Sequence, residues 1–249
     1  TQPDTYVEVL NRGLAHSDKL LRSWMRWPWT RKKVPRLLRE MSHEQVLLGI
    51  EHFILGDRRT CVSSFEKALN HRAEAQRLRS LGAVTYHDVQ ILSAALCAGL
   101  TERAEYFAAI LFDSFDPNVS VPKVPTSETE AVLRGRRGMA ALLGWIARRP
   151  LSLIEAHTNL SEGARAPSEQ FRLWGRCALA GVSRDQPALQ AALDELATFV
   201  REQVAHGDFK YSEERHVYLP GMGIIALARR DGLDVVVPQS PQFPLALLA

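Results

Sequence analysis

The stretch EQVLLGIEHFILGDRRTCVSSFEKALNH, Glu44 to His71, determines the fold class of this chain. Apolar residues recur at helical spacing in both of its halves, which predicts two amphipathic helices. Gly56 and Asp57 lie between the halves and are expected to end the first helix. Ser42, with Gln45 three residues later, is expected to cap its start. The stretch therefore predicts an αα-hairpin with a very short connection. The apolar stripes are Val46, Leu47, Ile50, Phe53 and Ile54, then Cys61, Val62, Phe65, Ala68 and Leu69.

The same periodicity continues along most of the chain and predicts an all-α fold of antiparallel αα-hairpins. We expect these hairpins to stack in a bundle or short solenoid, with a short extended C-terminal tail packed back on the helices. Prolines at the first turn and glycines after the last turn mark several of the helix ends. The expected helices cover Tyr86–Gly99, Thr101–Phe115, Ser127–Arg148, Pro150–Gly163, a segment from Pro167, Pro187–His206 and Leu219–Arg230.

Val119 to Pro125 reads as an extended linker, because the residue before a proline avoids the helical region. It divides the chain into an N-terminal helical half, 1–118, and a C-terminal helical half, 126–249, which we expect to pack as one domain. Gly135, Gly138 and Gly144 recur on the helix after the linker. Such small residues let a second helix approach closely.

Composition places the chain among ordinary globular proteins, with 46% hydrophobic and 24% charged residues. No apolar run approaches the ~20 residues of a membrane helix. The cysteines Cys61, Cys97 and Cys177 are far apart and odd in number, which favours buried thiols in a reducing cytoplasm over disulfides or a zinc site. No signal peptide is visible. Because the chain does not begin with Met, whether the N-terminus has been trimmed stays open.

Motifs for catalysis or for cofactor binding are missing from the sequence. There is no phosphate-binding loop, no dinucleotide fingerprint, no nucleophile elbow and no histidine pair at metal-ligand spacing. We therefore expect no enzyme activity, no metal and no cofactor. The alternative is an unrecognised all-α active site, which would require His87, Asp88, Glu214 and His216 to meet in one cleft.

The stretch RSWMRWPWTRKK, Arg22 to Lys33, holds three tryptophans among basic residues. Nine basic and four acidic residues up to Glu40 give this leading segment a charge of +5, which leaves −2 for the rest of the chain. The favoured interpretation is that Trp24 and Trp27 pack the segment onto the core. The alternatives are a protein interface, a membrane-surface patch or a site for single-stranded nucleic acid.

The C-terminal stretch ERHVYLPGMGIIALARRDGLDVVVPQSPQFPLALL, Glu214 to Leu248, resembles the ending of bacterial polymorphic-toxin immunity proteins. The nearest resemblance is to the immunity protein 49 family. The shared pattern is an apolar helix, a glycine, an acidic and valine-rich piece, a proline and a leucine close. The resemblance implies an all-α, non-catalytic protein that neutralises a cognate toxin by binding it in the producing cell.

We therefore expect a protein partner, a cognate toxin encoded by the adjacent gene, and neither nucleic acid nor a membrane. Within the hairpin, SSFEKAL also resembles the second helix of a tetratricopeptide-type repeat, although no ~34-residue period follows. This likeness leaves open a second interpretation, an adaptor that binds a peptide or protein. Charged residues near special features are the candidate interface: Arg26, Trp29, Arg31, Lys32, Lys33, Glu213, Glu214 and Arg215.

Overall fold

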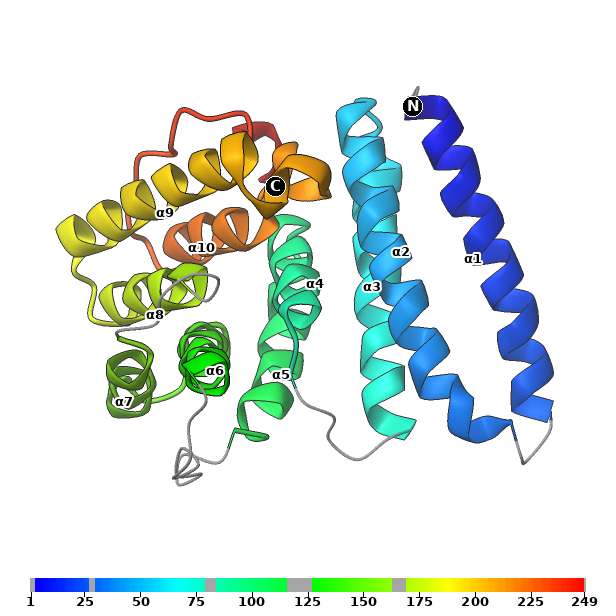
Figure 1. Cartoon of the computed structure of the whole chain (residues 1–249), viewed down its shortest axis with the longest axis horizontal. Coiled ribbons are helices and arrows are strands. Elements are labelled where there is room, and N and C mark those ends of the chain that lie inside the picture. The colour runs from blue at the N-terminus through cyan, green and yellow to red at the C-terminus, as the bar shows by residue number, and fades with distance from the viewer. Residues whose placement is uncertain (1–2, 27–29, 79–83, 116–126, 163–168, 249) are drawn as a thin grey trace.

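The computed structural model describes residues 3–26, 30–78, 84–115, 127–162 and 169–248. Within these ranges the chain forms ten α-helices and no β-strand, which confirms the predicted all-α fold (Figure 1). The predicted linker 119–125 lies outside the described residues. The helices are α1 (Pro3–Arg26), α2 (Val34–Ile54), α3 (Arg58–Leu78), α4 (Tyr86–Cys97), α5 (Thr101–Phe112), α6 (Ser127–Ile146), α7 (Leu151–Ser161), α8 (Glu169–Val182), α9 (Gln186–His206) and α10 (Leu219–Arg230).

The predicted αα-hairpin is formed by α2 and α3, which make the most extensive helix contact in the described chain. Gly56 adopts a φ of +79°, and the backbone N–H of Asp57 donates to the carbonyl of His52 at 2.8 Å. This is the six-residue closing bond of a Schellman turn, and glycine suits its left-handed residue.

The expected start of this hairpin is wrong. Helix α2 begins at Val34, eight residues before the proposed cap Ser42. The Ser42 hydroxyl is fully buried inside the helix pair and donates to the carbonyl of Ala68 at 2.7 Å. A serine can cap a helix, but its hydroxyl can also bond to a backbone carbonyl from within a helix. The presence of Ser42 alone therefore did not locate the start of the helix. Helix α5 begins at Thr101, the first residue of the expected helix.

Helix α1, which the sequence reading did not identify, lies alongside α2 at the N-terminal edge of the molecule (Figure 1). A small core, separate from the main one, joins the two helices. Trp24 is half-buried at its end and packs against Val34 and Leu38, so the predicted packing of Trp24 is confirmed. Trp27 lies outside the described residues. The buried residues of the small core between α1 and α2 are Leu10, Leu14, Leu37, Met41 and Leu48.

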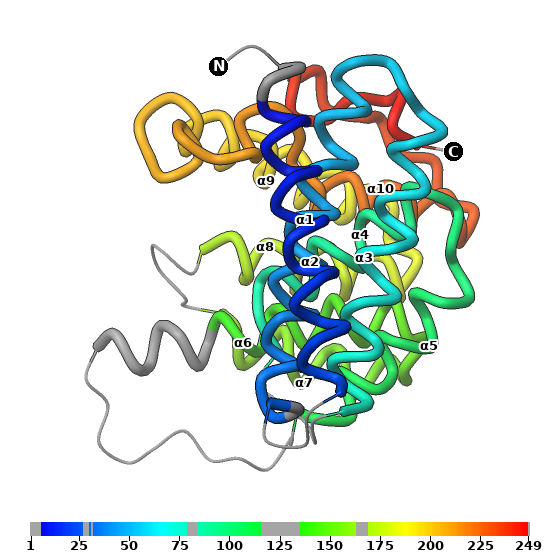
Figure 2. Tube along the Cα trace, turned by 90° about the vertical axis from the view of Figure 1, so that its right-hand side faces the viewer, coloured from blue at the N-terminus to red at the C-terminus, as the bar shows by residue number. Residues whose placement is uncertain are grey.

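The main core is built around α4 and α10, which pack against each other in the middle of the molecule (Figure 2). One buried cluster extends from Val46 in α2 to Leu248 near the C-terminus, so both sequence halves contribute to it. Trp174 in α8 is fully buried, and its indole N–H donates to the hydroxyl of Tyr218 at 2.9 Å. This hydrogen bond satisfies two polar groups that burial would otherwise penalise.

Close helix approach at glycine is confirmed at two of the three positions proposed. A Cβ added at Gly138 would lie 1.8 Å from the backbone oxygen of Phe171, so only glycine permits this α6–α8 contact. At Gly144 a Cβ would meet Ile154 at 2.9 Å. Gly135 is buried on the same helix.

After α10 the chain runs as an extended strip without a strand, and the β-like Val235–Val237 segment makes no ladder. The strip packs back on the helices, as expected. Phe243 and Leu247 enter the main core, and the backbone N–H of Tyr218 donates to the carbonyl of Gln242 at 2.8 Å. The end of the strip reaches α3, where the Arg58 guanidinium donates to the carbonyl of Leu248 at 3.1 Å.

Candidate functional site

The basic residues proposed as an interface are Arg26, the last residue of α1, and the three residues of the short 3-10 turn Arg31–Lys33. Arg26, Lys32 and Lys33 are exposed, as expected. Trp29 and the side chain of Arg31 lie outside the described residues. The structure therefore brings part of this set onto one surface.

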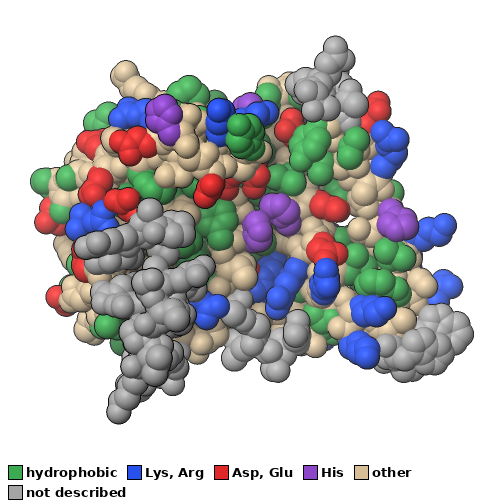
Figure 3. All heavy atoms as spheres, in the orientation of Figure 1, with side chains coloured by type: hydrophobic (Ala, Val, Ile, Leu, Met, Phe, Trp, Pro, Cys, Tyr) green, Lys and Arg blue, Asp and Glu red, His purple; other side chains and the backbone are tan. Residues whose placement is uncertain are grey.

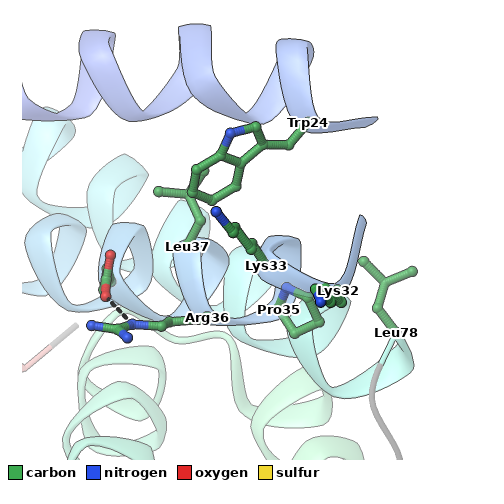
Figure 4. Close-up of a pocket in the computed structure, with 8 residues that line it drawn as sticks. Trp24, Lys32, Lys33, Pro35, Arg36, Leu37 and Leu78 are labelled. Carbon is green, nitrogen blue, oxygen red and sulfur yellow. Dashed lines mark hydrogen bonds and ion pairs between the residues drawn. The ribbon is translucent and has the colours of Figure 1, made fainter. Parts of the chain in front are cut away.

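That surface is a groove of about 830 Å³ between α1, the turn and the start of α2 (Figure 4). We call it the basic groove. The Lys33 ammonium lies 5.6 Å from the ring centroid of Trp24, close enough for a cation–π contact. Arg36 pairs with Glu40 at 2.9 Å, and the other cations are exposed at the rim. The residues that line the basic groove are Trp24, Lys32, Lys33, Pro35, Arg36, Leu37, Glu40 and Leu78.

The second proposed set, Glu213 to Arg215, forms a 3-10 turn beside α4. The expectation that all three are exposed holds for Arg215 only, because Glu213 is half-buried and Glu214 is only 5% exposed. Its Oε1 accepts hydrogen bonds from the Tyr86 hydroxyl at 2.8 Å and from Gln90 Nε2 at 3.0 Å. The carboxylate anchors the turn to α4 and is buried because it has these two donors.

Two histidines extend this polar cluster toward α2. The rings of His43 and His87 lie 4.2 Å apart between centroids, and His87 Nδ1 pairs with Gln90 Oε1 at 2.8 Å. The pKa of His43 is lowered to about 4, mainly by burial and also by the neighbouring His87, with Glu214 partly opposing the shift. His43 is therefore neutral at neutral pH. Figure 3 shows histidine side chains near the middle of this face.

A second opening, of about 390 Å³, lies between α1, the C-terminal end of α2 and the 3-10 turns after α9. We call it the acidic pocket. Burial raises the pKa of Glu51, and the nearby Arg215 opposes that shift. Burial also raises the pKa of Tyr6, reinforced by Glu51 and Glu213. The residues that line the acidic pocket are Tyr6, Leu47, Ile50, Glu51, Ile54, Tyr211, Ser212, Glu213, Arg215 and His216.

The basic groove and the acidic pocket share one side of α2. Glu40 lines the groove, whereas Leu47 and Glu51 line the pocket. These residues are seven and four positions apart, a spacing that aligns them along one stripe of an α-helix. The surface along α2 thus changes from basic at its start to acidic at its end. On the face shown in Figure 3, lysine and arginine side chains lie below the histidines, over the start of α2.

The alternative catalytic cleft does not assemble within the described part of the chain. Asp88 is buried and bound to Arg72, and it also accepts from the backbone N–H of Thr85 at 2.8 Å. His216 is exposed and accepts from Arg215 Nε at 2.7 Å. Only His87 and Glu214 approach each other, through Gln90.

Among the residues with described positions, no group of three or more His, Cys, Asp or Glu side chains could hold a metal ion. All three cysteines are buried. Burial raises the pKa of Cys61 to about 12 and raises that of Cys97 and Cys177 as well, so their thiols stay protonated at neutral pH.

None of the described helices is both long enough and apolar enough to span a membrane. Protein-family models, curated proteins and solved structures give no match to this chain. The basic groove and the acidic pocket are therefore the features from which a function can be argued.

Proposed function

We propose that this chain is a non-catalytic immunity protein that binds and neutralises a cognate bacterial toxin in the cytoplasm of the producing cell. The resemblance of Glu214–Leu248 to immunity proteins and the all-α fold support this proposal. The observation that carries it is the basic groove, which combines exposed cations with an aromatic and aliphatic floor.

Such a groove suits an acidic protein surface. Lys32 and Lys33 are exposed at its rim, whereas Trp24 and Leu37 supply an apolar floor. Tryptophan is prominent among the residues that dominate binding energy at protein interfaces, and flanking charges steer the encounter. An acidic segment with one apolar side chain would bury that side chain on Trp24 and place its carboxylates on the lysines.

The decisive experiment is co-expression with the product of the adjacent gene, followed by purification of the pair. Rescue of growth together with a stable complex would support the proposal. Lys32→Glu/Lys33→Glu should weaken the complex at least about tenfold, because two favourable charge contacts become repulsive. Lys19→Glu/Lys67→Glu changes the net charge equally at exposed lysines outside the groove and should have little effect. An adjacent product that is not toxic, or toxicity without rescue or complex, would reject the proposal.

The adaptor interpretation uses the same groove. Its open form, lined by Lys32, Lys33 and Arg36, also suits a short acidic peptide. The two functions differ in the partner. An adaptor would bind isolated acidic peptides with modest affinity and would not protect cells from a toxin.

A further inference from the structure

We infer that the acidic pocket is a socket for a cationic side chain, lysine or arginine, presented by the protein partner. The inference rests on the proposed function only in taking a protein as the source of the cation. It adds a second contact point at the opposite end of α2 from the basic groove.

The lining of the acidic pocket carries more negative than positive charge. Glu51 forms no ion pair or hydrogen bond within the described chain, and Glu213 accepts only a long bond of 3.3 Å from Gln90. Arg215 also lines the pocket and acts electrostatically on Glu51, and its Nε–H is directed to His216 Nε2 at 2.7 Å. Elsewhere on the surface, carboxylates such as Glu66 and Glu162 pair with arginines at 2.8 Å. With two carboxylates, Glu51 and Glu213, against the one guanidinium of Arg215, the pocket lining keeps a net negative charge.

Two tyrosine rings in the pocket favour a cationic ligand. Tyr6 and Tyr211 both line the pocket, and tyrosine rings attract cations through their negative faces. The structure already shows this preference, because the ammonium of Lys210 lies 5.4 Å from the ring centroid of Tyr211. Tyr211 is 83% exposed, so most of its surface is open to a partner.

The pocket also has an apolar wall that fits the aliphatic stem of a basic side chain. Leu47, Ile50 and Ile54 form an apolar wall on α2, and Ile54 is 43% exposed. A lysine or arginine carries an aliphatic stem that packs on such a wall while its charged end meets the carboxylates. A small inorganic cation would leave this wall uncovered, so charge and apolar surface together favour a long basic side chain.

The test uses the full chain and small probes, and it needs no toxin. N-acetyl-arginine N-methylamide and its lysine counterpart are titrated while backbone amide NMR signals are followed. N-acetyl-citrulline N-methylamide, which is neutral and nearly isosteric with the arginine probe, is the control. Saturable shifts confined to Tyr6, to α2 residues 47–54 and to residues 211–216, with the citrulline probe weaker, are expected. Equal binding of the citrulline probe, or shifts spread over the surface, would overturn the inference.

Variants that remove the pocket carboxylates test the same inference. Glu51→Gln/Glu213→Gln keeps shape and removes both charges, and should weaken probe binding about tenfold or more. Glu102→Gln/Glu155→Gln removes two exposed carboxylates outside the pocket and should bind like the parent chain. Amide spectra of each variant verify that it is folded. Undiminished binding by Glu51→Gln/Glu213→Gln would also reject the socket.

The two proposals fail separately. If a toxin is neutralised but the probes do not bind, the socket is wrong and the immunity function stands. If the probes bind in the pocket but no toxin is found, the cation site stands and the immunity function is wrong.

Discussion

Arg72 and Asp88 form an ion pair in the interior of the α3–α4 contact, with side chains 3% and 1% exposed. Asp88 also accepts from the Thr85 backbone N–H and so caps α4. Replacing Asp88 by alanine leaves a buried guanidinium without its carboxylate. We expect Asp88→Ala to lower the free energy of unfolding by about 3–5 kcal/mol, measured by urea denaturation.

Two comparisons make this prediction specific. Glu66→Ala removes a half-exposed pair with Arg103 and should cost at most about 1 kcal/mol. Arg72→Met/Asp88→Leu removes both charges at once and should be less damaging than Asp88→Ala alone. An Asp88→Ala cost as small as that of Glu66→Ala would show that the buried charge does not order α4.

Gly138 permits the backbone contact between α6 and α8. Because an added Cβ would lie 1.8 Å from the Phe171 oxygen, Gly138→Ala must separate the two helices. We expect a loss of about 2–3 kcal/mol in the free energy of unfolding. The control is Gly13→Ala in α1, where the Cβ would meet only the Glu44 carboxylate at 3.6 Å or more. That substitution should stabilise the chain by up to about 1 kcal/mol through helix propensity. Equal effects at both sites would contradict the packing argument.

His157 makes stability depend on pH. It is 3% exposed beside Phe112 and Phe115, and burial lowers its pKa to about 4, with a smaller effect of Arg137. Between pH 6.5 and 4 the unfolded chain binds a proton at this site and the folded chain does not. Stability from this site therefore falls as the pH drops, by about 2 kcal/mol between pH 7.5 and pH 5.

The measurement is urea denaturation at both pH values. His157→Phe should reduce the loss of stability on acidification by about that amount. His16→Gln removes an exposed histidine and should leave the loss unchanged. A parent chain and a His157→Phe variant with the same pH dependence would show that His157 protonates equally in both states.

Glu214 should act on stability rather than directly on a partner. Glu214→Ala removes the acceptor of the Tyr86 hydroxyl and leaves Gln90 Nε2 with only its long bond of 3.3 Å to Glu213. We expect a loss of about 1–3 kcal/mol in thermal or urea unfolding. Glu213→Ala, at the half-buried neighbour, should cost clearly less. If the order of the two effects were reversed, the assignment of Glu214 as the anchor of the turn would be wrong.

Helical periodicity was enough to predict the fold class, because most helices bury one clear stripe. The bounds of α10, Leu219–Arg230, agree with the prediction because a proline opens the helix and a glycine follows its end. Helix α1 was missed, although Leu10, Leu14, Leu21 and Trp24 recur at helical spacing. Its many polar and charged residues obscure the apolar stripe, although the spacing of the apolar residues alone indicates a helix.

The candidate sites were only partly predictable. The basic groove could be anticipated because its cations are clustered in the sequence. The acidic pocket could not, because Tyr6, Glu51 and Glu213 are far apart in the chain and meet only through folding. The burial of Glu214 was also hidden, because its two donors lie on α4, more than a hundred residues away.

The extended strip that joins Leu248 to Arg58 has a consequence for dissecting the chain. Leu247 lines a small cavity together with Phe53 and Cys61, so the last residues described complete the surface of the α2–α3 hairpin. A fragment ending near residue 118 would lack this cover, and a fragment starting near residue 126 would carry it with nothing to cover. The two sequence halves are therefore not autonomous folding units, and separate expression should yield material that recovers its structure only when both pieces are mixed.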